Sequence, residues 1–164
     1  MIDQQVIDNS LATRKVLEVR WNGDQFFAVA LGAIPAKPPT YPTAGTLLLC
    51  WGAAVQLLPL DPGMDLLSEG GCHPPVTGSY FDPTTATPLE IAEVIGQVMV
   101  ANGSLEIRYQ KTDRKTGVTT VGTYQLHNLA PKPKVGFLCE KKGTAEVRSF
   151  KFDSILGIQL PAPL

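Results

Sequence analysis

The sequence predicts a mainly β protein with one helix, in which a β-rich N-terminal half precedes a small antiparallel barrel. Short apolar segments with strand-like alternation recur along the chain, and Gly, Asn and Pro residues separate them. One segment alone has clear helical periodicity. The last four strand candidates follow that helix in quick succession, and closing such a meander removes the exposed edges of a short sheet.

Composition limits the class of protein. The 164 residues are 44% hydrophobic and 18% charged, which is sufficient for a real core. Apolar runs fall short of the ~20 residues that span a bilayer, and the N-terminus lacks the basic and apolar regions of a signal peptide. We therefore expect a cytoplasmic protein with no membrane contact, whose cysteines are free thiols.

Charge is divided unevenly along the chain. Residues 104–164 carry ten basic and five acidic side chains, a net charge of +5, whereas residues 1–103 carry four basic and ten acidic ones, a net charge of −6. This polarity indicates either an anionic partner for the C-terminal half or attraction between the two halves. A solvated basic loop face explains it equally well.

The chain begins with a segment that has no strong signal, and we expect residues 1–12 to be a flexible lead-in. A β-rich N-terminal region follows at residues 13–60. Within it, residues 14–21 and 25–34 predict a hairpin, because Asn22-Gly23 supplies the positive φ angles of a tight turn.

Two further segments complete the first half. The apolar residues 46–60 predict one or two buried strands broken at Gly52. Residues 61–86 are rich in Gly, Pro, Ser and Thr, and are expected to form an irregular linker or a packed loop.

Residues 87–164 begin with the well-signalled helix. Thr87 is the expected N-cap, Pro88 occupies the first helical position, and Glu90 completes a capping box. A stop signal follows at Asn102-Gly103. The apolar stripe between them predicts a core-facing helix; it comprises Ile91, Val94, Ile95, Val98 and Met99.

Four strands are expected after the helix. They cover residues 104–111, 118–129, 135–142 and 145–160. In the last, alternation places Arg148 on the same face as Phe150 and Phe152. We interpret this as a strand lining the mouth of the barrel, with Arg148 at the rim and the phenylalanines deeper.

The C-terminal half resembles a known family. The segments LEIRYQK, YQLHNLAPKP and FLCEKKGTAEVRSFKFDSI make residues 104–160 similar to the WYL domain. This domain is a small Sm-like or SH3-like barrel of bacterial transcriptional regulators and some defence-associated proteins. The name-giving Trp-Tyr-Leu is replaced by KVGFL, and the N-terminal half lacks the consecutive short helices of a winged helix-turn-helix. The motif residues that carry the resemblance are Tyr109, Arg148, Phe150, Asp153 and Ile155.

The resemblance implies a sensing barrel, often dimeric, whose basic residues hold an anionic ligand. Arg148 is the leading candidate, because a planar guanidinium fits phosphate or carboxylate in two-point contact. Its alternative role is a structural ion pair with Glu106, Glu140 or Asp153. The full expected ligand-binding set is Arg108, Tyr109, Lys111, Lys141, Arg148, Phe150 and Asp153.

Turn cations in this half alternate in sequence with Tyr109, Tyr124 and Phe137, a pattern that suits stacking and phosphate contact with single-stranded nucleic acid. The same lysines are also what keeps a small barrel soluble. A carboxylate in the position of Asp153 more often pairs with an arginine or stabilises a turn than takes part in catalysis.

We therefore expect a regulatory or sensor protein that binds a nucleotide or single-stranded nucleic acid. The alternative is a protein-interaction or oligomerisation module with no small-molecule ligand. No cofactor, metal site or catalytic residue is expected, because phosphate-loop, dinucleotide and paired zinc-ligand motifs are missing. The adjacent Cys72-His73 keeps a small hydrolase or metal enzyme as an outsider, whereas Cys50 and Cys139 are expected to be buried.

Overall fold

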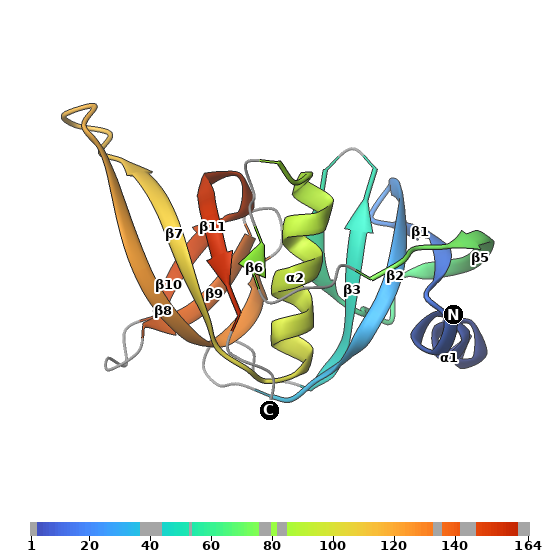
Figure 1. Cartoon of the computed structure of the whole chain (residues 1–164). Helices are drawn as coiled ribbons and strands as arrows, with labels where there is room; N and C mark the ends of the chain where they lie inside the picture. Colours follow the sequence, from blue (N-terminus) through green and yellow to red (C-terminus); the bar gives the residue numbers. More distant parts are fainter. Residues whose placement is uncertain are drawn as a thin grey trace.

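The computed structural model describes residues 3–36, 44–52, 54–75, 80–81, 85–132, 136–141 and 147–160. These residues form two antiparallel sheets and two α-helices, so the mainly β prediction is confirmed. In Figure 1, helix α2 (Pro88–Val100) lies between the two sheets, and α1 (Gln4–Thr13) lies beyond the N-terminal one. Among the described residues, no helix is long and apolar enough to cross a membrane.

The N-terminal sheet has five strands in the order β4-β3-β2-β1-β5. The predicted hairpin is confirmed, with φ angles of 50° at Asn22 and 82° at Gly23 in its turn. The apolar segment after it forms two strands, as expected. The strands are β1 (Lys15–Trp21), β2 (Asp24–Ile34), β3 (Gly45–Trp51), β4 (Gln56–Pro59) and β5 (Asp65–Cys72).

Two expectations for the first half are wrong. The lead-in is helix α1, which begins where the Asp3 carboxylate accepts a hydrogen bond from the Gln5 amide, and which buries Ile7 completely. Ile7 joins a second core with Val19 and Ala28 on the outer face of the N-terminal sheet. The stretch expected to be irregular contains β5, which pairs with β1, and the short β6 (Tyr80–Phe81), which joins the other sheet. Tertiary pairing therefore overrides weak local propensity in both places.

Helix α2 has the predicted capping box, with Thr87 and Glu90 each accepting from the other's backbone amide. It packs on β2, β3 and β4 on one side and on β8 (Thr119–Lys132) and the C-terminal 3₁₀ turn (Phe152–Ser154) on the other. Gly96 permits this close approach, because a Cβ there would lie 2.5 Å from Leu31 Cδ1. The helix is buried around most of its circumference and so needs both sheets.

The C-terminal sheet has six strands in the order β10-β9-β8-β7-β11-β6. Its last predicted strand, residues 145–160, is divided by a 3₁₀ turn, η1 (Phe152–Ser154), which carries the chain from the edge of the sheet to β7. Phe152 is buried in this turn. The other strands are β7 (Leu105–Thr112), β8 (Thr119–Lys132), β9 (Gly136–Lys141), β10 (Val147–Lys151) and β11 (Ile155–Gln159).

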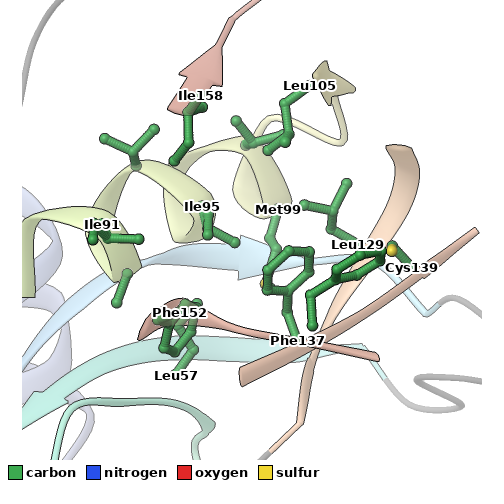
Figure 2. Packing of buried hydrophobic residues seen from close by; sticks show 14 of the residues in the cluster. Leu57, Ile91, Ile95, Met99, Leu105, Leu129, Phe137, Cys139, Phe152 and Ile158 are labelled. Carbon is green, nitrogen blue, oxygen red and sulfur yellow. The ribbon is translucent and has the colours of Figure 1, made fainter. Parts of the chain in front are cut away.

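One main core joins the two sheets through α2. Figure 2 shows Ile95 and Met99 of the helix beside Phe137 of the C-terminal sheet and Phe152 of the 3₁₀ turn. Leu57 of the N-terminal sheet belongs to the same cluster. Packing between the halves is therefore apolar.

Truncation of the helix at this junction tests its importance. Ile95 is fully buried, so Ile95→Ala should lower the free energy of unfolding by about 2–5 kcal/mol through lost burial and the cavity left behind. Urea unfolding followed by circular dichroism measures this change. Val121→Ala is the control, because Val121 is 52% exposed and its loss should change stability by less than about 0.5 kcal/mol. Equal losses in the two variants would contradict a core centred on α2.

Candidate ligand-binding site

A pocket of about 170 Å³ opens on the inner face of the C-terminal sheet, the face that carries the main core. Three strands supply its lining, β7, β8 and β10. Aromatic, cationic and hydroxyl groups are combined in it; the lining residues are Tyr109, Lys111, Tyr124, Arg148, Ser149 and Phe150.

Aromatic contacts form the pocket floor and show how the sheet curls. Tyr109 and Phe150 meet edge to face with ring centroids 4.7 Å apart, although β8 and β9 separate their strands in the sheet. The Tyr109 hydroxyl also accepts a hydrogen bond from the Lys151 amide at 3.1 Å. Edge strand β10 therefore folds back over β7, and the pocket lies where they meet.

Arg148 occupies the position that alternation predicted. It is half-buried in the pocket wall, shares a face with Phe150, and lies opposite Cys139 in the sheet register. Glu140, a possible structural partner, lies on the other face of β9, where His127 and Asn128 contact its carboxylate at 3.2 and 3.0 Å. Arg148 thus lies beside the buried Phe150, whereas Phe152, expected on the same strand, belongs to the 3₁₀ turn; a location at the mouth of a barrel stays a prediction.

The other candidate residues divide between the pocket and the outer surface. Lys111 lies in the pocket with Tyr109, so two positive charges flank the opening. Arg108 faces the opposite side of β7, where its stem lies beside Gly157. Asp153 is exposed in η1 and accepts a hydrogen bond from the Ser154 hydroxyl at 3.4 Å. The side chain of Lys141 lies outside the described part of the chain.

Two pocket residues, Tyr124 and Ser149, were not among the expected ligand-binding set, although Tyr124 was expected as a stacking ring. Tyr124 lies opposite Ile107 in the register of β7 and β8, which turns its ring to the inner face. Gly122 makes room for this ring, because a Cβ there would lie 2.9 Å from the Tyr124 hydroxyl. The sequence does contain a signal for this position, a glycine two residues before a tyrosine. The signal can be interpreted only when the pairing register of β7 and β8 is known. Ser149 gives no comparable signal.

A buried ionic cluster forms a second concentration of titratable groups, away from the pocket. Glu93 of α2 is fully buried and forms an ion pair with Arg14. Arg14 follows the last residue of α1 and has a left-handed backbone conformation. His73 Nε2 lies 3.7 Å from the same carboxylate, and Arg14 Nε donates to the His73 carbonyl at 2.7 Å. The cluster joins α1, β5 and α2, so its evident role is to position the helix.

The cysteines do not form an activated thiol site with the described histidines. Burial raises the pKa of Cys50 well above its usual value, and raises that of Cys139 to about 12, so both stay protonated near neutral pH. Their expected burial is confirmed. Cys72 is exposed, whereas the His73 ring packs on Trp51 with centroids 5.3 Å apart. No group of three or more metal-binding side chains occurs in the described ranges.

Comparisons of the chain with protein-family models, with curated proteins and with solved structures gave no match. The similarity of residues 104–160 to the WYL domain therefore stays a prediction. Any function assigned to the pocket depends on its own geometry.

The ionic cluster predicts a large cost for removing one partner. Arg14→Ala leaves the buried Glu93 carboxylate without its closest cation, so unfolding should become easier by about 3–5 kcal/mol. Arg20→Ala is the matched control, since Arg20 is exposed and its pair with Glu18 at 3.1 Å should contribute less than about 1 kcal/mol. Denaturant unfolding measures both, and similar effects would show that the Arg14 pair does not hold α2.

The cluster also predicts a dependence of stability on pH. Burial, followed by the charge of Arg14, lowers the pKa of His73, and Glu90 opposes this in part. Because the unfolded chain binds the proton first, stability should be greatest above about pH 6.5 and should fall as pH decreases through that value towards the lower folded pKa. Unfolding of wild type and His73→Asn across this range measures the effect, and identical pH profiles would exclude it.

Proposed function

We propose that this protein is a cytoplasmic regulatory or sensor protein, and that its C-terminal sheet is a WYL-like barrel of the Sm or SH3 type. Its ligand is anionic, either a nucleotide or a segment of single-stranded nucleic acid. The observation that carries this proposal is the pocket in which Arg148 and Lys111 flank the rings of Tyr109 and Tyr124.

The curl of the sheet supports the barrel. Strand β11 returns to pair with β7 after the 3₁₀ turn, and β10 approaches β7 from the other side through the Tyr109–Phe150 contact. Such a closing sheet places alternate residues in its interior and collects the others outside. The pocket then lies at the mouth of this interior, with Phe150 below Arg148.

The chemistry of the pocket supports an anionic ligand with a planar ring. A guanidinium binds phosphate through two parallel hydrogen bonds, and a lysine adds a second charge. Tyrosine rings offer stacking surfaces, and stacking contributes about 1–3 kcal/mol per base in single-strand binding. Among the described lining residues, both charged side chains are cations.

The size of the pocket indicates how much ligand it encloses. Its volume of about 170 Å³ is below the roughly 300–1,000 Å³ of pockets that enclose drug-sized ligands. A phosphate together with the edge of one ring fits this space, and the rest of the ligand would extend along the surface. This favours a polymer or a partly exposed nucleotide, and supports binding in place of catalysis.

Oligonucleotide binding tests the proposal. A fluorescently labelled oligothymidylate should bind the wild type, with affinity that falls as salt rises because cations on phosphates release counterions. Arg148→Ala should weaken binding by about 10- to 100-fold, corresponding to the roughly 1.5–3 kcal/mol of a charged hydrogen bond. Fluorescence anisotropy measures both.

The control is Arg108→Ala, which removes the same charge from the outer face of a neighbouring part of the sheet and should leave affinity within about twofold. Equal losses for Arg108 and Arg148 would indicate a diffuse electrostatic effect without a pocket. If the wild type binds no oligonucleotide, the same titration with labelled mononucleotides decides whether the pocket binds nucleotides at all.

A further inference from the structure

Two exposed features at opposite ends of the molecule are not used by the pocket or by the core. One is the hairpin of residues 112–121, here called the arm, which projects from the C-terminal sheet at the upper left of Figure 1. The other is the part of the N-terminal sheet that extends beyond α2, at the right of the same view. Both expose apolar side chains.

The arm is well formed although every residue in it is exposed. Asp113 holds its turn, because its carboxylate accepts from the Lys115 amide at 2.7 Å and its own amide donates to the Val118 carbonyl at 2.9 Å. The hydroxyls of Thr112 and Thr119 meet across the strands at 3.0 Å. A preformed element loses little conformational entropy on docking.

The arm combines exposed apolar and cationic side chains. Val118 and Val121 are 56% and 52% exposed. Arg114 and Lys115 lie in the turn beside them, and the acidic residue Asp113 is held by the turn itself. The arm therefore presents valines next to positive charge.

The N-terminal sheet presents the complementary pattern on a surface here called the open face, formed by the exposed Phe27 and Leu67 and the half-buried Glu69, with Glu18, which is 9% exposed, between the two apolar residues. Leu67, Glu18 and Phe27 lie in one cross-strand row on β5, β1 and β2. Their side chains point away from the α1 core, because Leu66, Val19 and Ala28 point into it. Phe27 and Leu67 are 41% and 50% exposed.

Glu69 gives the open face an accessible carboxylate, next to the buried one of Glu18. A hydrogen bond to Glu18 raises the pKa of Glu69, while Glu69 and the neighbouring Arg20 lower the pKa of Glu18. The Glu18 carboxylate already contacts Arg20 Nε at 3.1 Å, so the carboxylate that an incoming cation can reach is that of Glu69. The open face is thus suited to an apolar surface that carries basic side chains.

We propose that the arm of one molecule docks on the open face of a second copy of this chain. Apolar contact between Val118 or Val121 and Phe27 or Leu67 is combined with attraction between the basic turn and the Glu69 carboxylate. The two surfaces lie at opposite ends of the molecule (Figure 1). The contact is therefore head-to-tail, and it generates rings or short filaments. A contact this small binds weakly, in the micromolar range or above.

Sedimentation equilibrium tests the contact with single variants. The wild-type weight-average mass should rise with concentration at low salt and fall towards the monomer at high salt. Leu67→Lys on the open face and Val121→Glu on the arm should each keep the protein monomeric. Val147→Lys is the matched control, because this exposed valine of β10 belongs to neither surface and its substitution should leave association unchanged.

Mixing the two variants tests the head-to-tail arrangement. Leu67→Lys retains an intact arm and Val121→Glu retains an intact open face, so the mixture should regain association that neither variant has alone. No gain on mixing, or a wild type that stays monomeric at every concentration, would overturn the proposal. If Val121→Glu weakens oligonucleotide binding in a monomeric protein, the arm serves nucleic acid instead.

Discussion

The structure depends on the burial of helix α2. Its apolar residues extend around most of the helix, so a single sheet cannot cover them, and the two sheets meet by packing on its opposite sides. The resulting core, more than any polar contact, joins the acidic and basic halves of the chain. The ion pairs Arg14–Glu93 and His127–Glu140 each stay within one half.

Because α2 is buried so extensively, a charged residue within its buried surface is informative. Glu93 is the charged residue in an otherwise apolar stretch of α2, and its carboxylate requires a cation at one fixed place. Arg14 meets this requirement from the end of α1. Apolar attraction is not directional in itself, whereas the buried ion pair requires Glu93 to face Arg14. That orientation in turn presents Ile95 and Met99 to the C-terminal sheet.

Local signals in the sequence predicted the elements that form by local rules. Asn22-Gly23 defines its hairpin, and Thr87 with Glu90 defines the start of α2, because these residues act on their own backbone. Helix α1 also has a local start signal, the Asp3 cap, but its packing depends on distant partners, since the buried Ser10 hydroxyl bonds the Lys15 carbonyl and the Ala30 amide. Strand β5 likewise forms through its pairing with β1.

The candidate site was predictable to the same extent. Alternation along one strand was sufficient to place Arg148 with Phe150, and the motif around them pointed to Tyr109. Tyr124 required the register between β7 and β8, which sequence periodicity does not define. The cluster of Arg14, His73 and Glu93 required contacts between three distant segments. Arg108 was expected in the site but lies on the outer face of β7, because it is one residue from Tyr109 and adjacent positions in a strand point to opposite faces.

The position of α2 in the chain order has a consequence for how the protein can be made. The helix precedes β7 to β11, so during synthesis its second apolar side has no cover until those strands emerge from the ribosome. A fragment that ends after the helix would expose Met99 and its neighbours to solvent, and one that begins after the helix would leave Phe137 uncovered. The two sheets look separable in a drawing, but neither is a self-sufficient unit for expression. The chain should therefore be expressed with both sheets and the helix between them.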